Sequence, residues 1–224
     1  MSKNIYEIEI YDFEILGLLK EAYRRSDGVK AIFLTAIFTY IVIAVVLSGI
    51  FNLLLGGVVS EQINSLLSTP VLVPIMTGIT MLAIKYVRGE ELVLASIFDY
   101  FIKVWPLVFA SIATYAMMAV GFLLLVLPGI YLAVSYKFTL ALIADKDLGI
   151  WEAMELSRKT VTKRWFKFFG LDIAILIMMI ISFLAFGIGL IWTIPIAFIS
   201  QALLYHHLFD DEKSEENIQS ETDI

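Results

Sequence analysis

Four long apolar blocks constrain this chain more than any other feature of its sequence. About 20 apolar residues suffice for one helix to cross the hydrocarbon core of a bilayer. The first two blocks, 31–55 and 71–87, are each long enough for one such helix, the second at the short end of the range. The other two, 104–144 and 168–208, are each long enough for two. The sequence therefore predicts six spans.

Each of the two longer blocks contains an interruption at which we expect the chain to reverse. Pro128-Gly129 interrupts one block and Gly187-Ile188-Gly189 interrupts the other. Proline cannot continue a helix that precedes it, and glycine allows the backbone angles of sharp turns. The segment 56–70 reads as a loop. The predicted spans are therefore 31–55, 71–87, 104–127, 130–144, 168–186 and 188–208.

The composition agrees with a bilayer as the solvent for most of the chain. Of the 224 residues, 60% are hydrophobic and 17% are charged, whereas about 25% of a soluble domain is charged. Cysteine is absent, which excludes disulfides, thiolate metal ligands and cysteine nucleophiles. We therefore predict an all-α fold, a polytopic transmembrane helical bundle.

The basic residues predict how the bundle is oriented. Fifteen of the 16 lysines and arginines lie before the first span, around 85–103, within 146–167 or in the C-terminal tail, and Lys137 is the exception. The loop 56–70 and the two turns contain none. Lysine and arginine are enriched in cytoplasmic loops. We therefore expect a multi-pass protein of the cytoplasmic (inner) membrane with both termini in the cytoplasm.

Three segments that precede spans one, three and five carry apolar residues at helical spacing among charges. They lie at about 15–23, 94–101 and 150–165. Such segments are typical of amphipathic helices in the membrane interface. Each would lead into a hairpin of two spans, which makes a loose threefold repeat. Helices next to spans are common, so the same pattern could also arise without duplication.

The acidic character of the chain belongs to its tail. Residues 210–224 hold seven acids and one lysine, while the other residues carry 15 acids and 15 bases. A polar segment without aromatic residues cannot bury enough apolar surface to fold, so we expect an acidic, disordered cytoplasmic tail. The chain has no basic patch that would bind nucleic acid, and we expect no such partner.

One part of the chain has a recognisable order of motifs. It contains Leu127-Pro128-Gly129-Ile130-Tyr131-Leu132-Ala133-Val134, then Ala144-Asp145-Lys146-Asp147-Leu148-Gly149, Glu152-Ala153, Ser157 and Lys163-Arg164-Trp165. This order resembles the uncharacterised bacterial and archaeal membrane proteins that are grouped with the membrane domain of glycerophosphoryl diester phosphodiesterases. In that group the membrane domain can precede a soluble phosphodiesterase domain. We expect none here, so the resemblance implies architecture and not activity.

Lys137 is the strongest candidate for a binding residue. It lies near the middle of the predicted span 130–144, where an ammonium group costs at least about 2.5–3.5 kcal/mol. A carboxylate, a water-filled cavity or a headgroup reached by the flexible side chain would offset that cost. Asp172 is the only other charge well inside a predicted span. We therefore predict a Lys137–Asp172 pair, either as a structural ion pair or as part of a substrate or proton site.

A second candidate is the basic segment before the fifth span. It contains Arg158, Lys159, Lys163, Arg164 and Lys167 among aromatic residues. This mixture favours contact with anionic lipid headgroups, although cytoplasmic loops are basic by default. The adjacent His206 and His207 point about 100° apart on a helix and are poorly placed to share a metal. We predict no metal site and no cofactor.

Three functions fit this sequence. Because the nucleotide-, zinc- and serine-hydrolase motifs are absent, the first is a non-enzymatic membrane protein that organises or binds lipid or a partner protein, which can be a second copy of the chain. The second is a transporter or channel for a small solute or lipid that uses Lys137 and Asp172. The third is an enzyme that acts on lipid, which the missing motifs disfavour.

The lack of polar side chains at the tight turns generates a first prediction. We expect these turns to lie shallowly within the outer interface, so a cysteine at Ile188 should react slowly with a membrane-impermeant maleimide. The naturally cysteine-free chain is a clean background, and Ser65→Cys serves as the exposed reference. Equal labelling rates at the two positions would contradict the prediction.

Overall fold

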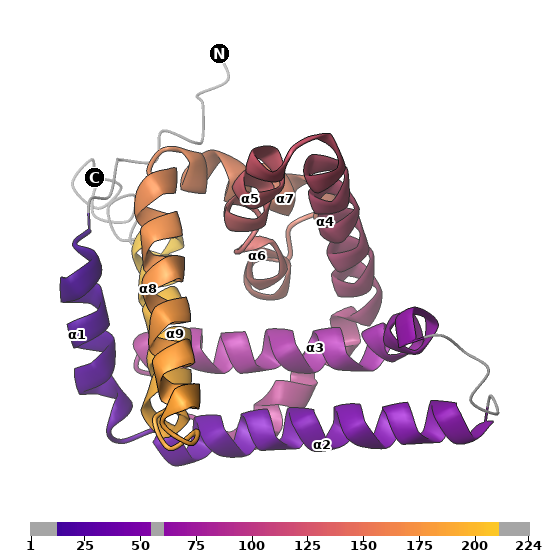
Figure 1. Cartoon of the computed structure of the whole chain (residues 1–224), viewed down its shortest axis with the longest axis horizontal. Coiled ribbons are helices and arrows are strands. Elements are labelled where there is room, and N and C mark those ends of the chain that lie inside the picture. The colour runs from indigo at the N-terminus through magenta and orange to yellow at the C-terminus, as the bar shows by residue number, and fades with distance from the viewer. Residues whose placement is uncertain (1–12, 55–60, 211–224) are drawn as a thin grey trace, which may run out of the picture.

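The computed structural model describes residues 13–54 and 61–210, and every regular element in these ranges is a helix (Figure 1). The all-α class is therefore confirmed. The helices are α1 (Ile15–Ser26), α2 (Lys30–Leu54), α3 (Glu61–Val87), η1 (Leu94–Lys103), α4 (Val104–Leu124), α5 (Val126–Ser135), α6 (Thr139–Lys146), α7 (Ile150–Thr162), α8 (Trp165–Leu184) and α9 (Leu190–Phe209). The predicted disordered tail lies outside these ranges, except for Asp210.

Five helical segments are long and apolar enough to cross a membrane, so the chain is a multi-pass membrane protein. They are Lys30–Leu54, Leu66–Val87, Leu94–Leu124, Val126–Lys146 and Trp165–Leu184. The predicted span 188–208 corresponds to α9, which also has 20 residues. Polar residues in its second half, Gln201, His206 and His207, lower its mean hydropathy, and it falls outside this set of five. The count of six spans therefore depends on α9.

Two predicted boundaries were wrong. The helix α3 begins at Glu61, so much of the predicted loop 56–70 is helical, and Pro70 and Pro74 lie inside the helix. Membrane helices tolerate such prolines because other groups satisfy the freed carbonyls. The first tight turn is centred on the extended residue Leu125, not on Pro128-Gly129. Pro128 instead lies in the first turn of α5, where no backbone donor is needed.

Glycines allow α4 and α5 to pack closely after this reversal. A Cβ atom at Gly129 would lie 2.4 Å from the ring of Phe122, and one at Gly121 would lie 3.0 Å from the Cα atom of Gly129. The predicted turn at Gly187–Gly189 is present between α8 and α9. Gly187 has a φ of 76° there, a conformation that glycine adopts without strain.

The predicted span 130–144 is not one continuous helix. Helix α5 ends at Ser135 and α6 begins at Thr139, so three residues, Tyr136 to Phe138, form a break. Lys137 is the central residue of this break. The region predicted from its apolar composition as one span is therefore two short helices joined at Lys137, the only lysine that was expected well inside a span.

The three predicted amphipathic segments are all helical, and each packs its apolar side on protein. Helix α1 buries Leu18 and Ala22 and lies along α9. Helix α7 buries Ala153 and Val161 and contacts α5 and α6. The middle segment, η1, is a 3₁₀-helix packed on α3. Their position in the membrane interface and the threefold repeat remain predictions, as does the cytoplasmic location of the termini.

The hairpins cross rather than run along one axis. In Figure 1, α2 and α3 lie across the direction of α8 and α9. The ammonium of Lys30 at the start of α2 lies 4.9 Å from the ring centre of Trp192 in the first turn of α9. The predicted topology placed Lys30 on the cytoplasmic side and Trp192 near the outer side of the membrane, so their contact differs from that topology.

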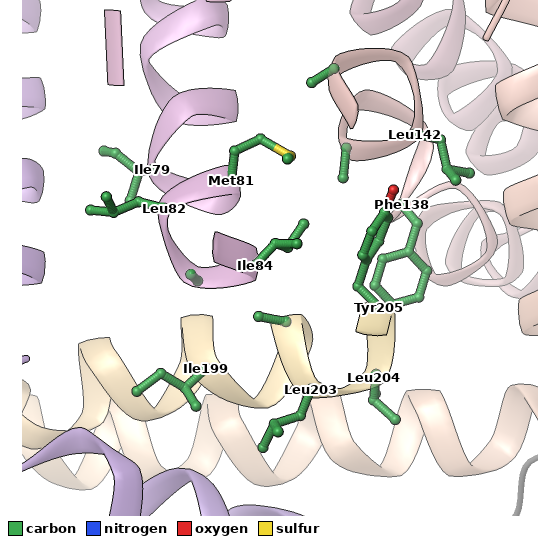
Figure 2. Packing of buried hydrophobic residues seen from close by; sticks show 14 of the residues in the cluster. Ile79, Met81, Leu82, Ile84, Phe138, Leu142, Ile199, Leu203, Leu204 and Tyr205 are labelled. Atoms are coloured by element: carbon green, nitrogen blue, oxygen red, sulfur yellow. The ribbon is translucent and has the colours of Figure 1, made fainter. Parts of the chain in front are cut away.

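The core lies where α3, α6 and α9 meet. Figure 2 shows Met81 and Ile84 of α3 pointing toward the side of the core where Phe138 and Tyr205 lie. Phe138, just before α6, lies beside Tyr205 of α9, with their ring centres 6.0 Å apart. Burying such large side chains against one another aligns these three elements.

The contact between α3 and η1 generates a second prediction. A Cβ atom at Gly78 would lie 2.2 Å from the carbonyl oxygen of Ile97, a backbone atom that cannot rotate away. Overpacking costs about 1–3 kcal/mol, more than the roughly 1 kcal/mol that alanine gains over glycine in a helix. Gly78→Ala should therefore lower the midpoint of thermal unfolding of the detergent-solubilised protein.

The matched control is Gly49→Ala in α2, where a Cβ atom would meet nothing within 4 Å. This variant should unfold at the wild-type midpoint or above it. An equal loss of stability in both variants would show that the close approach at Gly78 is not the cause.

Candidate functional site

Ser157 of α7 satisfies the backbone at the break between α5 and α6. Its buried hydroxyl donates a hydrogen bond of 2.7 Å to the carbonyl oxygen of Ser135 and accepts one of 3.2 Å from the backbone nitrogen of Phe138. Inside a membrane every backbone polar group needs a protein partner. One hydroxyl thus replaces helical hydrogen bonds and stabilises the bend that presents Lys137.

The ammonium of Lys137 forms an ion pair with Asp172 of α8. The Nζ–Oδ1 distance is 2.6 Å, and 13% of the lysine side chain and 32% of the aspartate side chain are exposed. Gln201 of α9 donates a 3.0 Å hydrogen bond to the same carboxylate oxygen. The rings of Phe138 and Phe168 lie within 6 Å of the ammonium. The predicted pair is therefore in contact, and its binding role remains a prediction.

A cavity of about 250 Å³ lies between α3, the break and α9. It is lined by Thr80, Ile84, Lys137, Phe138, Ala141, Ala197, Phe198, Gln201, Ala202 and Tyr205. Lys137 is the only charged residue in this lining, and Asp172 does not belong to it. The Oε1 atom of Gln201 is buried without a hydrogen-bond partner among the described residues. The cavity is therefore mostly apolar, with one cation and one unsatisfied acceptor.

A second polar cluster, which sequence reasoning missed, joins the ends of three helices beside the cavity. Arg88 follows α3 and makes two hydrogen bonds of 2.7 Å with Asp145 of α6 and two of 2.8 Å with Asp210 after α9. Tyr205, whose side chain also lines the cavity, donates to Asp145 at 2.8 Å. Lys146 donates to the carbonyl of Phe209.

The sequence did contain one signal for this cluster. Asp145 belongs to the motif that carries the family resemblance, and a carboxylate directly before the basic Lys146 at the end of a span needs a partner. Its partners could not be identified, because Arg88 and Asp210 lie far away in the chain. Asp210 was taken as the first residue of the tail, whereas it forms part of this folded cluster.

In the predicted lipid-contacting cluster, several basic side chains already interact with other groups of the protein. Arg158 and Lys159 both pair with Glu155, at 3.0 and 3.2 Å, and the hydrogen bond from Arg158 lowers the pKa of that carboxyl. Lys167 donates to the carbonyl oxygen of Phe13 at 3.1 Å. The other two members are Lys163, which is exposed, and Arg164, which is half-buried. Contact of this cluster with lipid headgroups remains a prediction.

The two histidines have local roles in the described part of the chain. The Nδ1 atom of His207 lies 2.7 Å from the carbonyl oxygen of Leu203, one turn earlier in α9. Among residues 13–54 and 61–210, no three histidine, aspartate or glutamate side chains gather in a way that would hold a metal ion.

The apolar helices define a multi-pass helical membrane protein, which has a mostly apolar cavity beside the Lys137–Asp172 ion pair. Comparisons with protein-family models, with curated proteins and with solved structures found no match for this chain. The function must therefore be argued from the site itself.

The ion pair generates a third prediction. Asp172→Asn should lower the unfolding midpoint, because it leaves the mostly buried ammonium of Lys137 without its carboxylate. Adding Lys137→Met should recover part of the loss. Residues in direct contact typically show coupling energies of about 0.5–3 kcal/mol in a double-mutant cycle. Strictly additive effects in detergent-solubilised protein would contradict an energetically coupled pair.

Proposed function

We propose that this chain is a non-enzymatic membrane protein that binds a membrane lipid in the cavity at Lys137. The observation that carries the proposal is the lining itself, which is mostly apolar and contains the ammonium-bearing Lys137 beside Gln201, whose buried Oε1 atom has no partner among the described residues. Ligand sites commonly combine apolar walls with a few polar groups that orient the ligand. The two hydroxyls of the lining are already engaged: that of Tyr205 donates to Asp145, and that of Thr80 donates to the carbonyl oxygen of Met76.

Two features support a lipid as the ligand. Thr80, Ile84 and Lys137 belong to segments apolar enough to span a membrane, so the cavity lies among helices that lipids surround. The carboxylate of Asp172 and the neighbouring aromatic rings also offset the cost of holding Lys137 at this depth. The ammonium of Lys137 is therefore held beside the cavity by a protein partner.

The break at Lys137 favours one alternative, a transporter or channel for a small solute or lipid. Discontinuous membrane helices line the substrate sites of many transporters, and here the interruption at Tyr136 to Phe138 holds a charged residue. Lys137 and Asp172 would then contribute to a pathway. In the structure Lys137 and Asp172 contact each other, and Asp172 is also bonded to Gln201, so we place this reading second.

The proposed function generates a fourth prediction, which native mass spectrometry of the gently extracted protein tests. Wild type should retain a lipid mass that Lys137→Met loses, because the variant removes the only charge in the cavity lining. Lys20→Met removes the same charge from an exposed position on α1 and should retain the lipid. A bare wild-type protein would contradict lipid binding and favour the transporter, and a retained protein mass would favour a partner or a second copy.

A further inference from the structure

The polar groups of the cavity specify what a ligand must offer, if the proposed lipid site is correct. An ammonium group has three donors, and Lys137 directs one of them to Asp172. The remaining donors can reach an anionic oxygen in the cavity. No acidic side chain lines the cavity to compete for them. The site therefore favours a ligand with a negatively charged oxygen.

Gln201 adds a second requirement. Its amide nitrogen donates to Asp172, which leaves its Oε1 atom as a buried acceptor without a described partner. An unsatisfied buried acceptor costs about 1–3 kcal/mol. Because Gln201 lines the cavity, a ligand whose hydrogen-bond donor reaches this atom is favoured. Lys137 and Gln201 contact the same carboxylate oxygen. The anionic oxygen and the donor must therefore be close together in one ligand.

The size and position of the cavity select a headgroup rather than a whole lipid. At about 250 Å³ it is smaller than the roughly 300–1,000 Å³ pockets that enclose drug-sized ligands. Thr80 and Ile84 lie in the last two turns of α3, just before Arg88. A cluster of charges such as Arg88, Asp145 and Asp210 belongs at the interface and not in the hydrocarbon. The cavity thus lies near the depth of the headgroups.

From these observations we infer that the cavity recognises the headgroup of an anionic phospholipid that carries a free hydroxyl. The phosphate oxygens accept hydrogen bonds from Lys137, and the hydroxyl donates to Oε1 of Gln201. The apolar walls contributed by Phe138 and Phe198 contact the carbon atoms between these groups and the start of the acyl chains.

Three lipids with identical acyl chains separate the two requirements. Phosphatidylglycerol has a phosphate charge and hydroxyls, phosphatidylethanol has the same charge without a hydroxyl, and phosphatidylcholine has no net charge. Each is titrated into the full-length, delipidated protein, and the bound fraction is measured by native mass spectrometry. Wild type should bind phosphatidylglycerol about three- to tenfold more tightly than phosphatidylethanol, the value of one hydrogen bond. Phosphatidylcholine should bind most weakly.

Two variants assign these preferences to residues. Gln201→Met should remove the difference between phosphatidylglycerol and phosphatidylethanol while both still bind more tightly than phosphatidylcholine. Lys137→Met should remove the preference for the anionic lipids, and Lys137→Arg, which keeps the charge, should restore much of it. Lys20→Met should behave as wild type. A melting curve of each variant identifies any that fails to fold.

The outcomes separate this inference from the function on which it rests. Equal binding of all three lipids at a site that depends on Lys137 would overturn the headgroup selectivity and leave lipid binding intact. Equal binding of the two anionic lipids would overturn the role of the hydroxyl. Failure of wild type to bind any of the three would contradict the proposed function itself.

Discussion

Arg88 is the residue on which the arrangement of the site most depends. Its guanidinium makes four hydrogen bonds that join the C-terminal ends of α3, α6 and α9, and these same elements form the walls of the cavity. Hydrogen bonds between two ionised groups are roughly twice as strong as neutral ones. They raise the pKa of Arg88 above its ordinary value, with Asp145 contributing most, although burial opposes this. The ends of the three helices are therefore joined through the positively charged guanidinium of Arg88.

The sequence predicted those features that depend on local composition. Long apolar blocks predicted the membrane helices, amphipathic spacing predicted α1 and α7, and Gly187 predicted the last turn. It misplaced features that depend on contacts between one helix and another. The break at Lys137 is stabilised by Ser157 of another helix, and the reversal at Leu125 depends on how Gly129 packs against Phe122. No period of hydrophobic residues encodes such contacts.

The candidate site shows the same division. Lys137 and Asp172 were paired correctly because they were the only charges expected deep within spans, and an unpaired charge there is costly. The hydrogen bond from Gln201 to Asp172 and the cavity could not be derived, since both need the position of a third helix. A lysine in a membrane helix commonly extends its side chain toward the aqueous interface, and Lys137 differs from that pattern. Its ammonium pairs with the carboxylate of Asp172 and lies within 6 Å of the rings of Phe138 and Phe168.

The long separation between the partners of Arg88 has a consequence for biosynthesis. Asp145 and Asp210 follow Arg88 by 57 and 122 residues, and chains fold from the N-terminus while they are being made. The first hairpin, α2 and α3, is therefore complete while Arg88 still lacks both carboxylates. Asp145 arrives with α6, and Asp210 only after α9. Because α9 contributes to its lining, the cavity can be completed only after α9 has been made. A ribosome that stopped before α9 would leave Arg88 with only half of its hydrogen bonds.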